Sequence, residues 1–257
     1  IESEINDLYG PPRFTLEERR FYFALNDRES KVANSIRNRS QRCFFVSLLG
    51  YFKSRPVMLN PNFGDVEDDL RFIAKEQLPG PGLRRFSLDQ RQKDRLYQKV
   101  LKLAGYEKWR DNIHRGHVLN HLLQAARSWI DARYLFDAAT EYLAMRCIAI
   151  PKYTVMQTLV SQAINEERAR ITDTLNSQMT TEMTNNLTDL VDGKEKLPLS
   201  DLRQSAKSFA PPELDKELKV NRHIQLWMSD VNTMVKTLSL SLKNQQHFAS
   251  MVEYYGS

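Results

Sequence analysis

Glycine and proline are scarce in this chain, and long stretches without either residue dominate it. Only 9 glycines and 10 prolines occur among the 257 residues. Leu, Ala, Gln, Lys, Arg and Glu, which all favour helices, fill the segments between them. Apolar residues recur in these segments with the spacing of an amphipathic helix. The sequence therefore predicts an all-α fold, with small helix-turn-helix-like modules in tandem and a helical connector after them.

Four short helices are expected in the first module, residues 1–79. Thr15 and Glu18 have the spacing of a capping box and mark the start of the first one. The other three are expected at residues 28–36, 40–53 and 65–77. The aromatic and leucine residues from Phe44 to Phe52 are expected to fix the third helix in a core, so that the arginines before them face a ligand surface.

The segment LPGPGLRRFS, residues 78–87, is the clearest break in the helical pattern. Two prolines and two glycines interrupt any helix there, and we place a domain boundary after Pro79. The second module, residues 80–150, is expected to contain three helices. They run from Ser87 to Leu103 with a left-handed stop at Gly105, from about Trp109 to Ile130, and from about Tyr134 to Cys147.

Residues 151–257 are predicted to form the helical connector. Pro151 is expected in the first turn of its first helix, where the missing N–H costs nothing. A single apolar stripe follows, suited to packing on a neighbouring helix. It consists of Ile164, Ile171, Leu175, Met179, Met183, Leu187 and Leu190. Gly193 and Pro198 interrupt the pattern, Ser200 caps a short helix, Pro211 and Pro212 turn the chain, and the end from His223 to Tyr255 is helical.

Several absences point to a cytoplasmic protein without a membrane partner. No apolar run approaches the roughly 20 residues that cross a bilayer. The first residues show neither the basic nor the apolar region of a signal peptide. Cys43 and Cys147 both fall in apolar helical patterns, where a small buried thiol is the usual arrangement, and this fits a reducing compartment.

The positive charge is concentrated in two blocks, although the net charge of the whole chain is only +5. Residues 28–55 carry seven cations and one anion, and residues 80–115 carry ten cations and four anions, so each block has a net charge of +6. Many of these cations are arginines at predicted helix starts, where free backbone amides also favour phosphate. Amide and ring donors that can contact base edges lie between them. This composition is typical of a helix that faces a DNA groove.

The predicted DNA-binding residues fall in three places along the chain. They are Arg37, Asn38, Arg39, Gln41, Arg42, Lys53 and Arg55 in the first module, Arg84, Arg85, Arg91, Lys108, Arg110, Asn112, His114 and Arg115 in the second, and Lys152, Tyr153 and Gln157 at the start of the connector. Arg84 and Arg85 are expected to enter a minor groove as an arm. The last group would lie on the first turns of a recognition helix.

Two clusters could hold a metal ion, but each has a simpler explanation. His114, His117 and His121 share one helix face, as zinc ligands would, but arginines crowd the same region and no fourth ligand is near in sequence. The acidic residues Asp65, Glu67, Asp68 and Asp69 suit the dipole of a helix start. No glycine-rich phosphate loop or nucleophile elbow is present. We therefore expect no catalytic residue, metal, cofactor or small-molecule substrate in this chain.

Five segments together resemble one known family. They are LGYFKSRP, DVEDDLRFIAKE, LAGYEKWRDN, AATEYLAMRCIAIPKYTVMQTLVSQA and LSLSLKNQQHFASMVEYY, spread over nearly the whole chain. They resemble the N-terminal half of the large transposases of the Tn-three type, which move replicative, cointegrate-forming transposons of bacteria. The resemblance implies a helical region that binds the terminal inverted repeats of the transposon. It also implies that the catalytic acids and their Mg²⁺ belong to an RNase H-like, DDE-type domain further downstream, which nothing here matches.

Two other functions stay open. The apolar stripe from Ile164 to Leu190 would also suit a scaffold that docks a partner or a second copy, with cations that only keep the protein in solution. A metal-dependent nuclease that uses the histidine row is the third candidate. DNA binding predicts a steep dependence of affinity on salt, and a scaffold does not.

Overall fold

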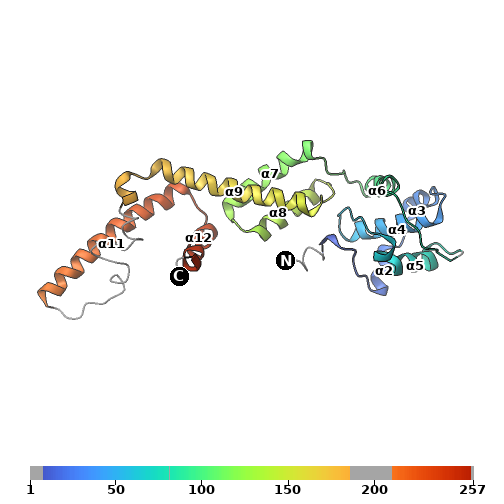
Figure 1. Ribbon diagram of the computed structural model, residues 1–257, viewed down its shortest axis with the longest axis horizontal. Coiled ribbons are helices and arrows are strands. Elements are labelled where there is room, and N and C mark those ends of the chain that lie inside the picture. Colours follow the sequence, from blue (N-terminus) through green and yellow to red (C-terminus); the bar gives the residue numbers. More distant parts are fainter. Residues whose placement is uncertain (1–7, 81, 186–209, 256–257) are drawn as a thin grey trace. The chain divides into compact units, whose positions relative to one another are not determined.

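The computed structural model describes residues 8–80, 82–185 and 210–255 (Figure 1). Within them every regular element is a helix, which confirms the all-α prediction. The extended pairing in this part of the chain is limited to two isolated parallel bridges, Val57 with Ile150 and Glu107 with Ile148. The chain divides into two compact units, Ile1–Leu122 with Ala132–Gln162 and Leu123–Asp131 with Ala163–Ser257.

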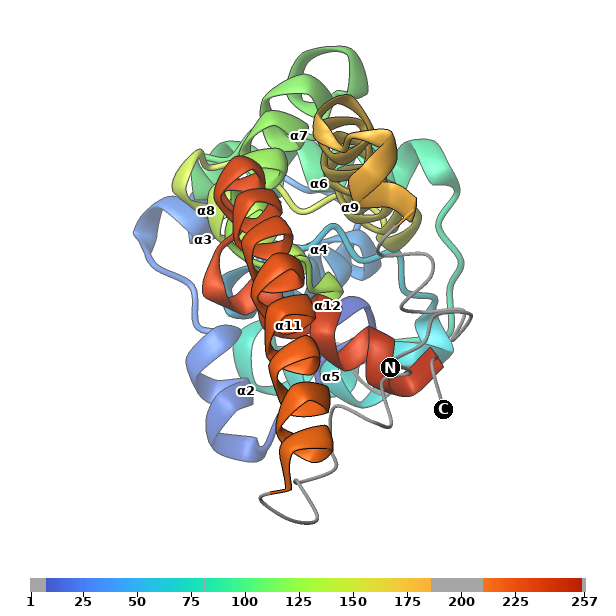
Figure 2. The same cartoon turned by 90° about the vertical axis from the view of Figure 1, so that its left-hand side faces the viewer.

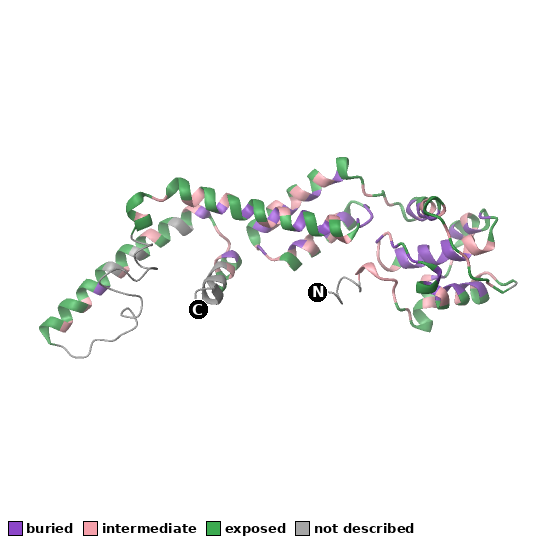
Figure 3. Ribbon diagram, viewed as in Figure 1, coloured by how far each residue is buried: buried purple, intermediate pink, exposed green. Residues whose placement is uncertain are grey.

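One apolar helix, α4 (Arg39–Ser54), is the centre of packing in the first unit. The unit also contains α2 (Leu16–Tyr22), α3 (Asp27–Asn34), α5 (Glu67–Phe72), α6 (Gln90–Ala104) and α8 (Ala132–Met145), with the short 3₁₀ helix η1 (Phe63–Val66) and the short π-helix η2 (Ile73–Gln77). Every residue from 43 to 52 is buried (Figure 3). A helix that is apolar on all sides must be covered on all sides. α2, α3, α5 and α6 all pack against it.

Several helix ends are set by local sequence. Thr15 and Glu18 form the predicted capping box of α2, and Asn26 with Glu29 does the same for α3. Gly105 ends α6 in the left-handed conformation that was expected of it, with φ of 74°. The start of α6 differs from the prediction: Asp89 is its cap, because the Asp89 carboxylate accepts a hydrogen bond from the Gln92 N–H at 2.7 Å.

The segment before α6 is anchored in the core. Residues 82–89 have no regular structure, but Phe86 lies edge-on against both Phe44 and Phe63, with ring centroids 6.3 Å and 5.2 Å away. At its other end α6 is followed by Tyr106, which packs on Phe52 of α4. The described part of the first predicted module and most of the second therefore lie in one compact unit, whereas residues 123–131 of the second module belong to the other unit. The independent folding of the two modules stays a prediction.

Two long helices pass from one unit into the other. They are α7 (Asp111–Ser128) and α9 (Tyr153–Gln178). α9 begins two residues after Pro151, so the prediction that this proline occupies the first turn was wrong. The residue before Pro151 still pairs with another segment, because the N–H of Ile150 donates to the carbonyl of Pro56 at 2.9 Å.

The second unit also contains α11 (Pro211–Leu238) and α12 (Leu242–Tyr255), joined by a short turn (Figure 2). Its core is formed by Ile130, Ile171 and Leu238, with Ile164 and Leu175 packed against them. The predicted stripe is therefore partly used inside the chain. It is also not one helix, because α9 ends at Gln178.

The structure differs from the sequence-based expectation at Pro211 and Cys147. Pro211 does not turn the chain but starts α11, in the first turn where proline fits. Cys43 is buried as expected, whereas Cys147 follows the end of α8, has a φ of 52° and is exposed. The predictions for Leu187, Leu190, Gly193, Pro198 and Ser200 fall outside the described residues.

Candidate nucleic-acid interface

The exposed face of α6 carries a row of cations. Arg91, Arg95 and Lys102 are separated by four and seven residues, which places them on one side of a helix, and all three are exposed. The opposite side of α6 is buried through Leu96, Val100 and their neighbours. Among the residues that the structure describes, none of the three cations has a hydrogen-bond or ion-pair partner. We call Arg91, Arg95 and Lys102 the α6 row.

Arg37 flanks the α6 row. Lys99, one helical position to the side of the row, donates a long hydrogen bond of 3.4 Å from Nζ to Oγ of Ser35. This contact brings the turn between α3 and α4 next to α6. Arg37 lies in that turn two residues after Ser35 and is exposed. The turn therefore adds a fourth cation beside the row.

Arg84 and Arg85 lie on the extended segment that leads into α6. Both side chains are exposed, and neither has a partner in the described part of the chain. The next residue, Phe86, is held between two core rings. The two guanidinium groups are thus carried by a segment that is free of regular structure but fixed at one end.

Three segments meet at a second place in the first unit. The Ala149 N–H donates to the carbonyl of Glu107, and the Ile150 N–H donates to that of Pro56, both at 2.9 Å. These pairings bring the backbone next to Arg55, Lys108 and Lys152 together, although the three residues are far apart in sequence. Lys108 and Lys152 are exposed and Arg55 is half-buried.

Arg39 and Arg42, both among the predicted DNA-binding residues, are half-buried and donate to backbone carbonyls. Nη2 of Arg39 donates to the carbonyls of Ala74 and Leu78 at 3.0 Å and 2.8 Å. Arg42 donates from Nε and Nη2 to the carbonyl of Ile36 at 3.1 Å and 2.9 Å. Both guanidinium groups satisfy carbonyls at the C-terminal ends of helices, those of Ala74 and Leu78 at the end of η2 and that of Ile36 after α3. Their role in the structure is to hold these helix ends in place.

Several other predicted contacts also have structural partners. Lys53 pairs with the buried carboxylate of Glu29 at 2.8 Å. The Asn38 side chain caps α4 by accepting from the N–H of Gln41, which is itself half-buried. Tyr153 packs edge-on against Tyr9. The free surface for a ligand is therefore smaller than the sequence indicated.

Three of the predicted DNA-binding residues near the start of α7 also have partners within the protein. His114 is only 6% exposed, and its Nδ1 accepts from the Arg110 N–H at 3.0 Å, so it caps the helix. Arg110 pairs with Glu107 at 2.9 Å, although both are exposed. Arg115 donates to Oε1 of Gln162 at 3.0 Å. Asn112 on α7 and Gln157 on α9 are exposed and keep their side chains available.

The histidine row does not form a metal site. His114 faces the core beside Trp109, and His121 stacks on Tyr142 with centroids 4.7 Å apart. Within the described residues no group of three or more His, Cys, Asp or Glu side chains is arranged to hold a metal ion. The acidic residues at the start of α5 line a cleft of about 940 Å³ together with arginines. One of them, Asp69, is buried and paired with Arg19 at 2.7 Å.

Arg95 and Lys102 belong to the second basic block but were not among the predicted DNA-binding residues. Their place in the site could have been predicted, because positions 91, 95 and 102 fall on one face of the predicted helix.

No helix in the described ranges is both long enough and apolar enough to cross a bilayer.

The fold and the site define an all-α protein whose first unit carries an exposed, unpaired row of cations. The chain belongs to the family described as Domain of unknown function (DUF4158), which matches residues 2–163. That match ends one residue after Gln162, where the first unit ends. No curated protein matches the chain.

Proposed function

We propose that the first unit binds double-stranded DNA and that the chain is the part of a Tn-three-type transposase that recognises the terminal inverted repeats. The observation that carries the proposal is the α6 row, whose three cations are exposed and unpaired on a helix packed against the core. An α-helix fits the major groove of B-DNA, and cations along it neutralise backbone phosphates. The resemblance of five sequence segments to Tn-three-type transposases is the reason for proposing terminal inverted repeats as the DNA.

The exposed residues on and near α6 contact different parts of the DNA. The α6 row and Arg37 contact phosphates along the groove, and Arg84 reaches the adjacent minor groove as an arm. Such arms read the width and the A·T content of the minor groove. Lys108, Lys152, Asn112 and Gln157 form a second contact region on the same unit. Strand transfer is not assigned to any residue of this chain.

The test is a binding titration across salt. Fluorescence anisotropy is measured with a labelled duplex of the terminal inverted repeat and with a scrambled duplex of equal length. Binding through Z phosphates gives a slope of about −0.9Z for log affinity against log salt. A steep slope with preference for the repeat supports the proposal. A flat line, or equal affinity for both duplexes, contradicts it.

Self-association is the second candidate function, and α11 carries it. Leu214, Leu218 and Leu226 on this helix are 43%, 56% and 61% exposed, and Met228 is 54% exposed. Exposed large apolar side chains on one element are typical of surfaces that meet another protein. Sedimentation equilibrium over a range of concentrations distinguishes a monomer from a dimer. Replacing two of these leucines with glutamine abolishes a dimer that depends on α11.

A further inference from the structure

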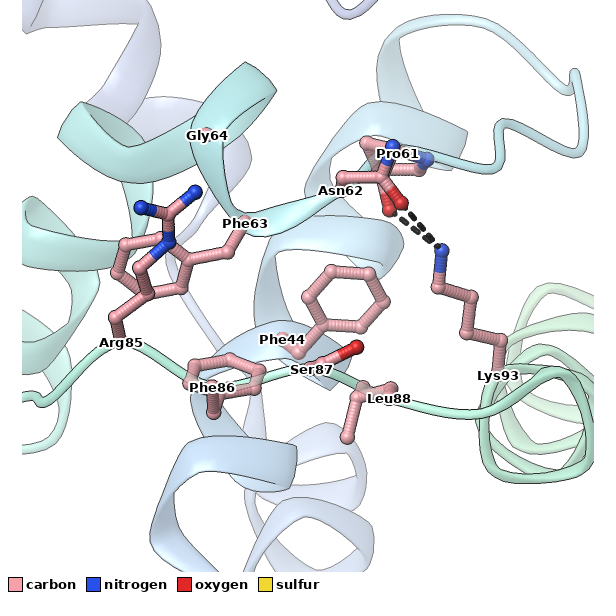
Figure 4. Close-up of a pocket in the computed structure, with 10 residues that line it drawn as sticks. All are labelled: Phe44, Pro61, Asn62, Phe63, Gly64, Arg85, Phe86, Ser87, Leu88 and Lys93. Atoms are coloured by element: carbon pink, nitrogen blue, oxygen red, sulfur yellow. Dashed lines mark hydrogen bonds between the residues drawn. The ribbon is translucent and has the colours of Figure 1, made fainter.

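A small pocket lies where the arm enters α6. Its volume is about 200 Å³, and it is lined by residues 61–64, residues 85–88, Phe44 and Lys93 (Figure 4). The rings of Phe44, Phe63 and Phe86 form its apolar wall. Pockets for drug-sized ligands have volumes of about 300–1,000 Å³. The space therefore suits a single small group and not a whole nucleotide.

Lys93 brings a buried positive charge to this pocket. The residue is only 7% exposed. Its Nζ donates to the carbonyl of Pro61 at 2.9 Å and to Oδ1 of Asn62 at 3.3 Å (Figure 4). Both acceptors are neutral. An ammonium group has three N–H donors, so one donor has no acceptor among the described residues.

This arrangement is unusual within the protein itself. The other buried Asp, Glu and Lys side chains in the described part of the chain are Glu29, Asp69 and Glu167. Each has an opposite charge, namely Lys53, Arg19 and Arg170, at 2.7–2.8 Å. Buried lysines are almost always paired, because an isolated charge is costly to remove from water. Lys93 is the exception.

The carboxylates nearest in sequence to the pocket are already engaged. Asp65 accepts from the Asn62 N–H at 2.7 Å, Asp89 accepts from the Gln92 N–H at the same distance, and Asp94 accepts from Nε2 of Gln90 at 3.1 Å. Arg85 adds a second cation to the pocket lining, is exposed and has no partner in the described residues. The lining thus has two positive charges and no negative one, which is the chemistry of an anion site.

We propose that this pocket binds a phosphate group, held by the Lys93 ammonium, with the Arg85 guanidinium closing on it from the opposite side of the pocket (Figure 4). The phosphate supplies the negative charge that Lys93 lacks and accepts its remaining N–H. Resting on the proposed function, the inference takes this group to be a backbone phosphate of the bound DNA, gripped where the arm joins α6. The same chemistry also fits free phosphate, and the two sources are separated by experiment.

The first experiment uses inorganic phosphate alone. Backbone amide signals of Gly64, Phe86 and Ser87 are followed by NMR while phosphate replaces chloride at constant ionic strength. We expect saturable shifts at these amides. Lys93→Met, which keeps the apolar stem, should weaken phosphate binding about tenfold or more, because a charge-assisted hydrogen bond is lost. Arg85→Gln should weaken it as well.

Arg84→Gln is the matched control, since it removes the same charge one residue outside the pocket. It should leave phosphate binding unchanged. Arg85→Gln also guards against a folding defect in Lys93→Met, because the Arg85 side chain is exposed and supports no other residue. Absence of shifts in the wild type, or equal weakening by Arg84→Gln and Arg85→Gln, overturns the site.

The second experiment uses the DNA titration. If the pocket holds a backbone phosphate, Lys93→Met lowers the magnitude of the salt slope by about 0.9. An unchanged slope with intact phosphate binding in the wild type overturns the backbone assignment and leaves free phosphate as the ligand. If the wild type binds phosphate but no duplex, the proposed function fails and the pocket stands. If the wild type binds the duplex but phosphate causes no shifts, the phosphate pocket fails and the proposed function stands.

Discussion

The phenol of Tyr51 donates a hydrogen bond of 2.6 Å to Oδ2 of Asp69 inside the first unit. The other carboxylate oxygen of Asp69 accepts from Nε of Arg19 at 2.7 Å. Three helices, α2, α4 and α5, are joined through these three side chains. The buried charge is fully paired, so this cluster stabilises the scaffold that presents the basic surface and is not free to bind a ligand.

Tyr51→Phe tests that cluster. The variant keeps the ring but leaves Oδ2 of buried Asp69 without its donor. Hydrogen bonds to charged groups contribute about 1.5–3 kcal/mol, and we expect a loss of that size in the free energy of unfolding. Urea denaturation measures it. Tyr22→Phe is the control, because its ring stacks on Phe14 and its hydroxyl has no partner in the described residues, so its effect should be near zero.

Alkaline pH should destabilise the first unit through three tyrosines. Burial raises the pKa of Tyr51, Tyr97 and Tyr9 above the ordinary value, and the charge of Asp69 raises that of Tyr51 further. Phenols ionise near pH 10 in the unfolded chain, where the folded chain keeps these protons. The contribution of these three tyrosines to stability is therefore constant below about pH 10 and is lost as the pH rises above it.

Tyrosinate absorbance and circular dichroism, followed together against pH, check this prediction. Three of the ten tyrosines should ionise only as helix content is lost. In Tyr97→Phe the transition should move to higher pH, provided that the core accepts the smaller side chain. Ionisation of all ten tyrosines before any loss of helix would contradict it.

Arginines that donate to backbone carbonyls and arginines that are exposed on α6 should differ in their effects on stability and on DNA binding. Arg39→Ala leaves the carbonyls of Ala74 and Leu78 without donors, and we expect it to lower the free energy of unfolding by about 1–3 kcal/mol. Arg91→Ala removes an exposed, unpaired side chain and should change it by less than about 0.5 kcal/mol. For DNA the order reverses, because Arg91→Ala removes a phosphate contact and reduces the salt slope by about 1.

Melting curves and anisotropy on the same preparations distinguish the two effects. Arg95→Ala should behave like Arg91→Ala, and Arg42→Ala like Arg39→Ala, since Arg42 holds the carbonyl of Ile36. A loss of DNA affinity in stable Arg39→Ala, with no loss in Arg91→Ala, would move the interface from α6 to the start of α4.

Local sequence predicted much of the fold, because local interactions determine those features. The capping box of Thr15 and Glu18 and the left-handed Gly105 each depend on residues within one helical turn. The fate of Arg39 could not be predicted in this way. Its carbonyl partners lie 35 and 39 residues further along the chain, and only the packing of α5 and η2 against α4 brings them near.

The same limit applies to the candidate site. A count of charges along the sequence treats Arg42 and Arg95 alike, although one holds a carbonyl and the other faces water. Helical spacing would have separated the α6 row from the buried Lys93 of the same helix. The isolation of Lys93 from any carboxylate depends on residues 61–62, and their approach to α6 is a tertiary contact.

Gly50 is required by the close approach of α2 to α4. A Cβ at this position would lie 2.6 Å from Cε1 of Phe23, whose ring is fully buried and cannot withdraw. Overpacking of this kind costs about 1–3 kcal/mol, more than the gain of about 1 kcal/mol in helix propensity. Gly50→Ala should therefore lower the melting temperature.

Gly116→Ala is the matched control in α7. A Cβ there meets nothing within 4 Å, so only the helix propensity changes. We expect a gain of up to about 1 kcal/mol in the free energy of unfolding. Equal gains in both variants would mean that Phe23 can move aside, and that α2 is less firmly packed than the structure indicates.

Asn244 joins α12 to the end of α7 in the second unit, and its amide cannot be replaced by a carboxylate. Its Nδ2 donates to the carbonyls of Ala126 and Arg127 at 3.0 Å and 3.1 Å, and its Oδ1 accepts from the Ile130 N–H at 2.7 Å. The side chain is fully buried. Asn244→Asp keeps the acceptor but places a charge against two carbonyl oxygens, and we expect a loss of about 2 kcal/mol or more in the free energy of unfolding.

Asn244→Ala should lose all three bonds, and hydrogen exchange at Ile130 should then accelerate because its N–H has no acceptor. In Asn244→Asp that amide should stay protected relative to the rest of the unit, so equal exchange in the two variants would show that the Ile130 bond does not depend on Oδ1. The exposed Asn165→Asp, on α9, controls for the change of charge and should leave stability and exchange unchanged.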